Sequence, residues 1–158
     1  MKDYYHYFVN KGNHPDKNDI LKQEEYRFKT FDQNTARQII QQIIEVAKTY
    51  DRPFASRIIY KDKIIGEYSE LENTSWLNRK EKVCHETKHS SYYIFLDNIQ
   101  SHLYDYMLND ESYGICGGSF PLYEKDEFVG SITFTGLRPQ EDHGVIIQAL
   151  EKVFQEKN

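Results

Sequence analysis

The chain has 158 residues, with 20 basic and 25 acidic side chains and a formal net charge of −5. Leu, Ile, Val and Phe make up about a quarter of it, above the level of roughly 20% below which a packed core becomes doubtful. These values exclude a wholly disordered chain. They also disfavour a nucleic-acid partner, because general affinity for nucleic acid comes from summed positive charge.

The length predicts one domain. No apolar run reaches the roughly 18 residues of a membrane span, and the first thirty residues lack a basic start followed by a hydrophobic stretch. We therefore expect a cytoplasmic protein without a membrane segment. Cys84 and Cys116 form no CxxC pair, which predicts free, buried thiols in preference to a disulfide.

Residues 1–16 are polar and aromatic by turns, and Gly12 and Pro15 interrupt any period. They predict an N-terminal arm whose aromatic side chains need a surface to pack on, and a second subunit is one candidate for that surface. The single domain then spans residues 17–158. Its first helix is predicted to begin with an Asp32 cap and to end before Pro53. The apolar stripe of this helix consists of Ala36, Ile39, Ile40, Ile43, Ile44 and Ala47.

Four short segments rich in β-branched and aromatic residues predict two hairpins. The first hairpin pairs residues 54–60 with 64–69, and the second pairs 118–123 with 128–135. Within the last of these segments Ser and Thr alternate with Ile and Phe, which is typical of a strand with two different faces.

Two helices are predicted between the hairpins, over residues 74–88 and 91–108. A final helix begins at Pro139, with Glu141 and Asp142 in its first turn, where acidic side chains favour the positive end of a helix. The order helix, hairpin, helices, hairpin, helix predicts an α+β fold, an antiparallel sheet of two hairpins packed with helices.

The sequence His85-Glu86-Thr87-Lys88-His89 matches HExxH, in which two histidines one helical turn apart bind zinc. Tyr92 and Phe95 stand where the extended motif has Gly and His. We therefore interpret the match as an incidental polar helix surface, and we expect no metal site. No nucleophile elbow occurs either, so no catalytic residue is assigned.

Arg79 and Lys82 recur at helical spacing and make a local basic face in an acidic protein. Guanidinium and ammonium groups on one stripe can hold carboxylates or phosphates of a ligand. The alternative is a solvated helix surface with weak ion pairs.

Gly117 and Gly118 precede a strand, where glycine permits a positive φ or a close approach of the backbone to a ligand. The alternative is a tight entry into the strand. His143 follows Asp142 in the first turn of the last helix and could accept a proton or act as a ligand, or it could be a capping residue.

Several short motifs together carry a resemblance to a known family. They are Trp76-Leu77, Arg79-Lys80, Ser90-Ser91-Tyr92, Gly117-Gly118-Ser119-Phe120-Pro121, Val129-Gly130-Ser131-Ile132-Thr133, Thr135-Gly136 and Asp142. With these residues the C-terminal half resembles the GlcG/HbpS-like family, often labelled the haem-degrading domain, and the middle segment looks like its small, single-domain UPF branch. The resemblance covers roughly residues 20 to 155.

This resemblance implies a PAS- or profilin-like α/β sandwich that forms homo-oligomers, at least dimers. It also implies binding, and in some relatives breakdown, of haem or related tetrapyrroles. Haem is therefore the first cofactor to consider. The fold follows from such a resemblance more firmly than the function does.

Two hypotheses follow. The first is a protein that binds a small planar or anionic ligand where the paired glycines, the basic helix and the opening turn of the last helix converge on one hollow. Its predicted binding residues are Arg79, Lys82, His89, Gly117, Gly118, Phe120, Pro121 and His143, with His89 or His143 as a possible axial or proton-transfer group. The second is a non-catalytic oligomeric interaction protein, in which the same segments serve subunit packing.

Overall fold

The four strands of the computed structural model, which describes residues 3–156, form one antiparallel sheet in the order β2-β1-β4-β3. The strands are β1 (Ala55–Tyr60), β2 (Lys63–Ser69), β3 (Ser119–Glu124) and β4 (Glu127–Thr135). The two hairpins join where β1 pairs with β4 and Ile58 lies opposite Ile132. The predicted α+β fold is confirmed, and each predicted strand end lies within one residue of the observed one.

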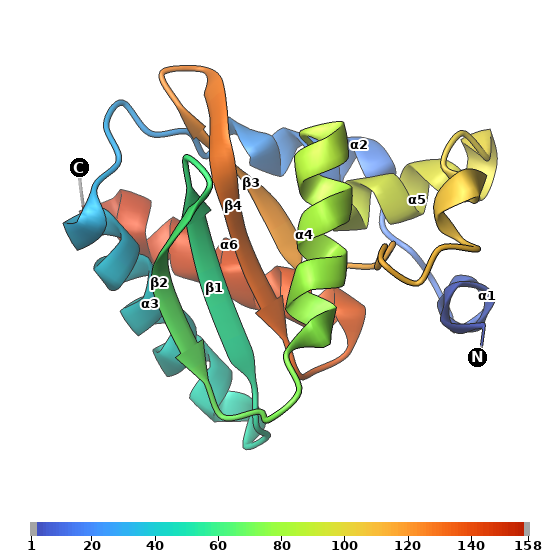
Figure 1. The fold of residues 1–158 in the computed structure, drawn as a ribbon, viewed down its shortest axis with the longest axis horizontal. Coiled ribbons are helices and arrows are strands. Elements are labelled where there is room, and N and C mark those ends of the chain that lie inside the picture. The colour runs from blue at the N-terminus through green and yellow to red at the C-terminus, as the bar shows by residue number, and fades with distance from the viewer. Residues whose placement is uncertain (1–2, 157–158) are drawn as a thin grey trace.

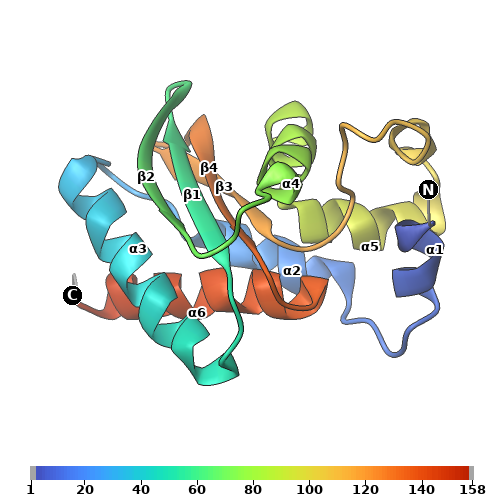
Figure 2. The same ribbon diagram turned by 60° about the horizontal axis from the view of Figure 1, so that its bottom comes forward.

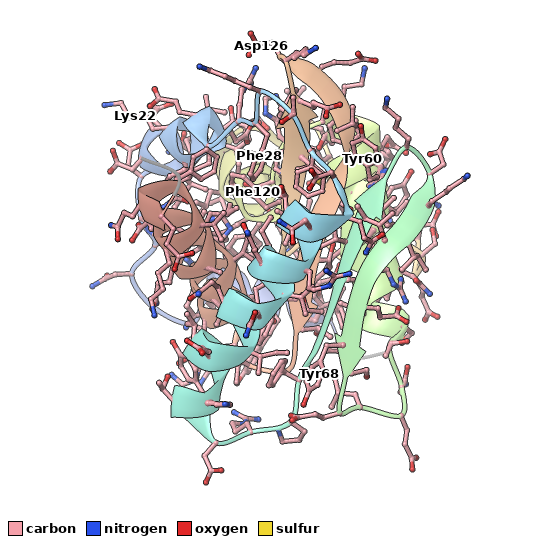
Figure 3. The ribbon with its side chains drawn as sticks, turned by 90° about the vertical axis from the view of Figure 1, so that its left-hand side faces the viewer. Lys22, Phe28, Tyr60, Tyr68, Phe120 and Asp126 are labelled. Carbon is pink, nitrogen blue, oxygen red and sulfur yellow. The ribbon has the colours of Figure 1, made fainter. Side chains whose placement is uncertain are left out.

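The sheet separates two layers of helices (Figures 1 and 2). Helices α3 (Gln33–Ala47) and α6 (Pro139–Glu156) cover one face, and α4 (Ser75–Thr87) covers part of the other. The main core lies on the α3 and α6 side. Phe28 and Phe120 lie in this core, between the helices and the sheet (Figure 3). Its fully buried members include Ile39, Ile43, Ile58, Ile132, Phe134 and Leu150.

The alternation along β4 explains why the two faces differ. Ile132 and Phe134 belong to the core beneath α3 and α6. Ser131 and Thr135 contact α4 instead: Ser131 Oγ lies 2.8 Å from a ring nitrogen of His85, and Thr135 Oγ1 accepts from Lys80. Because successive side chains of a strand point to opposite faces, the layer between the sheet and α4 is polar.

The second middle helix is shorter than predicted. Helix α5 (Ser91–Ser101) is capped by the Ser90 side chain and ends at His102, which has a φ of 57°. The Asn98 side chain accepts from the backbone N–H of Tyr104 and holds the chain in a turn. A 3₁₀ turn, η3 (Asp105–Met107), follows. The helical prediction for 102–108 was therefore wrong, because the Asn98 side chain accepts the Tyr104 N–H that a continuing helix would have bonded to a backbone carbonyl.

The sequence pattern did not predict two short helices near the N-terminus, α1 (Tyr4–Val9) in the arm and α2 (Lys17–Lys22) at the start of the domain. The aromatic side chains of the arm pack on the chain's own α5 region. Tyr5 is 5% exposed, and Tyr4 and Phe8 pack against the same cluster. Two further 3₁₀ turns are η1 (Gln23–Glu25) and η2 (Lys48–Tyr50). Within residues 3–156 no helix has the length and apolar character needed to span a bilayer.

Candidate functional site: a cavity over a buried ion pair

A lysine and an aspartate form an ion pair inside the domain, where α4 meets the start of α6. Lys80 Nζ lies 2.7 Å from Asp142 Oδ2, and each side chain is 2% exposed. Such residues are almost never fully buried unless they are paired, because taking a charge out of water costs several kcal/mol. Their position between the sheet and two helices is therefore an unusual feature of the fold.

The remaining polar atoms of the pair are also bonded. Lys80 Nζ donates to the carbonyl oxygen of Phe134 at 3.0 Å and to Thr135 Oγ1 at 3.3 Å. Asp142 Oδ1 accepts from the backbone N–H of Leu137 at 2.9 Å. Burial raises the pKa of Asp142, and the Lys80 ammonium opposes that shift. All three ammonium protons have acceptors, and the contact with Thr135 is the longest.

A cavity of about 340 Å³ lies over this ion pair, and we call it the Lys80 cavity. Lys80, Asp142, Thr135 and Cys116 give it a polar base. Its other lining residues are Phe8, Leu71, Asn73, Trp76, Gly136, Leu137 and Pro139. Most of these are apolar, and the volume lies at the lower end of the roughly 300–1,000 Å³ of small-molecule sites. Burial raises the pKa of the Cys116 thiol to about 11, so this thiol stays protonated.

The three segments expected to converge do meet at this cavity: α4 contributes Lys80, the residue before the paired glycines is Cys116, and the opening turn of α6 contributes Asp142. The eight predicted binding residues are not among the lining side chains. The segments converge, but neighbouring residues face the cavity.

The paired glycines pack against the chain's own backbone. A Cβ on Gly117 would lie 2.3 Å from the carbonyl oxygen of Pro139. A Cβ on Gly118, which has a φ of 134°, would lie 2.5 Å from the carbonyl oxygen of Phe134 and 2.6 Å from Lys80 Nζ. Glycine therefore lets this loop approach the ion pair closely.

The two predicted cationic residues both contact Tyr113, but they differ in exposure. The Arg79 guanidinium lies 3.8 Å from the ring centroid of Trp76 and donates to the carbonyl oxygen of Tyr113 at 3.3 Å. Lys82 is exposed and donates to Ser112 Oγ. Arg79 thus supports the back of a cavity wall, whereas Lys82 faces solvent.

His143 is fully enclosed. Its Nε2 lies 2.6 Å from Gln23 Oε1, Nδ1 has no partner, and its ring packs near Tyr92 and Phe120. Burial lowers the pKa of His143 to about 3. Phe120 is a core residue, and Pro121 is buried opposite Ser131 in the β3–β4 pair.

His143 predicts a loss of stability on the acidic side. The unfolded histidine takes up a proton near its ordinary pKa of 6.5, while the folded one stays neutral down to about 3. The free energy of unfolding should therefore fall by about 1.4 kcal/mol for each pH unit below about 6, from this residue alone. Urea unfolding at several pH values measures the slope. His143→Gln should flatten it, whereas His102→Gln, at an exposed ring, should not; equal slopes in all three proteins would contradict this account.

The other predicted histidine lies on another side of the molecule. His89 Nδ1 is 2.9 Å from Glu24 Oε1, and this contact raises the pKa of His89. Lys22 and Asp126, at the same end of the molecule in Figure 3, line the same open hollow of about 690 Å³. The hollow is also lined by Asn18, Leu21, Glu24, Glu25 and Arg27.

The residues of the HExxH match have separate partners. Helix α4 ends at Thr87, and Lys88 adopts a φ of 61°, so His89 lies outside the helix. His85 contacts Ser131, and Glu86 accepts from Tyr106 and Tyr113. In the part of the chain that the structure describes, no group of three potential ligands could hold a metal ion. Cys84 and Cys116 are both free and buried, as predicted.

Lys80 and Asp142 are the central residues of the cavity, and the sequence patterns did not single them out as binding residues. A signal was available for Lys80. The buried face of α4 includes Leu77, Lys80, Glu81 and Cys84, which recur at positions i, i+3, i+4 and i+7. A lysine within a stripe that otherwise packs inward indicates a buried charge with a partner elsewhere in the chain.

Comparison with known proteins gives a consistent family. The HbpS-like family model, described as haem degrading protein HbpS-like, matches residues 31–151. A UPF0303 protein of Psychromonas ingrahamii is 30% identical over 141 residues, which cover 84% of this chain and 89% of the relative.

Solved structures share the fold. The crystal structure of Ybr137w protein matches with a TM-score of 0.77 and 21% identity, covering 88% of each chain. A structure described as a PduOC:heme complex matches with a TM-score of 0.63 and 14% identity, covering 77% of this chain and 94% of that one.

Proposed function

Since the chain belongs to the HbpS-like family, we propose that it is a small-molecule-binding protein whose ligand is an organic anion, with its carboxylate at the base of the Lys80 cavity and its apolar part between Trp76 and Leu137. The observation that carries this proposal is a buried ammonium group at the base of a mostly apolar cavity. Ligand sites commonly combine apolar walls with a few polar groups that fix orientation.

The bond between Lys80 and Thr135 is the natural place for such a carboxylate. At 3.3 Å it is the longest of the three bonds made by the ammonium group, and Thr135 itself lines the cavity. A carboxylate oxygen is a stronger acceptor for an ammonium donor than a neutral hydroxyl. Lys80 would then keep Asp142 and Phe134 as partners and exchange only the third acceptor.

Haem, which the family description implies, does not fit the Lys80 cavity or the hollow at His89. No histidine or methionine lines the Lys80 cavity, its one thiol is held protonated, and the macrocycle is larger than about 340 Å³. The larger hollow at His89 carries three carboxylates, and the His89 ring already contacts one of them, Glu24, at 2.9 Å. These carboxylates oppose haem propionates. We therefore place the ligand among smaller anions.

The chain contains a single tryptophan, and Trp76 lines the cavity, so its fluorescence reports binding directly. Benzoate and phenylacetate are suitable probes, with benzamide and phenylacetamide as uncharged counterparts. We expect saturable fluorescence changes with the acids and weaker ones with the amides. Equal responses to acids and amides would contradict the role of Lys80, and no saturable response to any probe would remove the proposed function.

Charge at the mouth of the cavity provides a variant test. Leu71 lines the cavity and is half-buried, so a charged side chain there can reach solvent. Leu71→Glu should weaken benzoate binding by about threefold to tenfold, because like charges repel across a partly desolvated site. Leu71→Lys is the matched control and should bind at least as well as the unaltered protein. Equal weakening in both variants would indicate lost apolar contact instead of electrostatics.

Self-association is a second candidate function, favoured by exposed apolar residues after α5. Leu103 is 68% exposed and Tyr106 is 58% exposed, which is unusual for large apolar side chains close together in sequence. Native mass spectrometry should detect at least a dimer, and Leu103→Glu should shift it toward monomer. Ile64→Glu, on the β1–β2 hairpin, tests whether the effect is specific to this surface. A monomer in the unaltered protein would end this candidate.

A further inference from the structure

One residue of the N-terminal arm, Phe8, is among the three residues that line both the Lys80 cavity and a second hollow. Phe8, Cys116 and Pro139 line both spaces. The second hollow has a volume of about 80 Å³, and its other lining residues are Lys11, Gly12, Asn13, His14, Tyr92, Phe95 and Gln140. Because three residues are shared, the two spaces are neighbours, and Phe8 is the one that does not belong to the domain itself.

The arm is anchored firmly at its start. Tyr4 Oη accepts from the backbone N–H of Ile115 at 2.9 Å. The Tyr4 ring packs edge-on against the Trp76 ring, with 5.1 Å between the ring centroids. Tyr5 is buried and its hydroxyl accepts from Asn98 Nδ2 at 3.0 Å. These contacts hold the beginning of α1 against the domain.

The far end of α1 is less deeply buried than Tyr5. Phe8 and Val9 are half-buried against the same cluster, the Val9 carbonyl oxygen lies 2.9 Å from His14 Nε2 within the arm itself, and Asn10 is exposed. Gly12 then adopts a φ of 134°, and a Cβ added there would meet nothing within 4 Å beyond its chain neighbours. A helix of six residues has little stability of its own, so its position depends on these tertiary contacts. Phe8 therefore lies at the end of α1 whose displacement from the domain should cost less free energy.

We propose that Phe8 is a removable partition that sets the length of ligand the Lys80 cavity accepts. This inference rests on the proposed function and adds a ligand class to it. With Phe8 in place the cavity takes short carboxylates. When α1 swings away, the two hollows become one groove that leads past Cys116 to the aromatic side chains of Tyr92 and Phe95, so the favoured ligand is an elongated monocarboxylate with an apolar or aromatic tail.

The partition can be tested without any ligand, through the thiol beneath it. Cys116 lines both hollows but is only 2% exposed, whereas Cys84 is 0% exposed and lines neither. Phe8→Ala should raise the rate of Cys116 alkylation by iodoacetamide at about pH 8 by roughly tenfold, since reactivity follows exposure. Mass spectrometry of peptides locates the label. Cys84 reports any general opening of the fold and should stay unlabelled.

Asn10→Ala is the matched control, because Asn10 directly follows the same helix, is exposed and lines neither hollow. It should leave the Cys116 rate unchanged. If Cys84 is also labelled in Phe8→Ala, Phe8→Leu serves as the second variant. Its rate of Cys116 alkylation should lie between those of the unaltered protein and Phe8→Ala. Equal Cys116 rates in the unaltered protein, Phe8→Ala and Phe8→Leu would overturn the partition.

Ligand length provides the second measurement. In Phe8→Ala the affinity for 6-phenylhexanoate should rise by at least about tenfold. This acid has four more methylene groups than phenylacetate, and the joined groove would bury them. The affinity for phenylacetate should change by less than about twofold, because its contacts stay within the Lys80 cavity. Equal changes for both acids would overturn the length role of Phe8. Absence of binding by either acid to either protein would remove the proposed function, while the alkylation rates would still decide whether Phe8 covers Cys116.

Discussion

Replacing Lys80 with methionine should lower the free energy of unfolding by about 3–5 kcal/mol, the usual cost of breaking a buried ion pair. The substitution leaves the Asp142 carboxylate inside the domain with only the backbone N–H of Leu137 as a described partner. It also removes the donor from the carbonyl oxygen of Phe134. The cost comes from uncompensated polar groups, because methionine itself fills a similar volume.

Urea unfolding followed by circular dichroism measures this effect. Lys82→Met is the matched control on the same helix, and it should change stability by less than about 1 kcal/mol because the Lys82 side chain is exposed. The double variant Lys80→Met with Asp142→Leu should recover much of the loss, since an apolar pair needs no counter-charge. Equal small effects at Lys80 and Lys82 would show that the ion pair is not needed for stability.

Replacing Gly118 with alanine should cost about 3 kcal/mol or more, because two independent constraints act on this position. Its φ of 134° is rarely adopted by residues with a side chain. The added Cβ would also lie 2.5 Å from the Phe134 carbonyl oxygen and 2.6 Å from Lys80 Nζ. The substitution should therefore move the β3 entry away from the ion pair and weaken benzoate binding as well.

Gly144 is the matched control within α6. No atom lies within 4 Å of the Cβ that alanine would add there, and the position is helical. Gly144→Ala should raise the free energy of unfolding by about 0.5–1 kcal/mol, because alanine loses less conformational freedom than glycine in a helix. Thermal and urea unfolding of both variants make the comparison. If Gly118→Ala were as stable as the unaltered protein, the loop could accommodate a Cβ at this position, and the expected clash would be contradicted.

The interior of the fold was predictable where side chains follow a local period. The stripe from Ala36 to Ala47 predicted α3, and the Asp32 cap is present, with its side chain accepting from the backbone N–H of Thr35. The alternation in β4 predicted a strand with one apolar and one polar face. Both signals depend on contacts within a few residues, which a sequence displays directly.

The arm and the end of α5 were not predictable in the same way. Helix α1 has only six residues, too few for an apolar period to repeat, and it is held by contacts with Asn98 and Ile115, each more than 90 positions away along the chain. Helix α5 ends because Asn98 accepts from the backbone N–H of Tyr104, a local competition that apolar spacing does not reveal. Their conformations therefore depend on particular side-chain partners.

The candidate site shows the same division. From the sequence alone, the family resemblance, the hairpins, the helices and the meeting of three segments could be stated. Which side chains face the cavity was decided by the tertiary structure: Lys80 reaches Asp142, 62 positions away, because α4 and α6 both pack against β4 and bring the two side chains together. Sequence periodicity identifies which face of a helix or strand is buried. The residues that contact this face are set by how elements distant in sequence pack together.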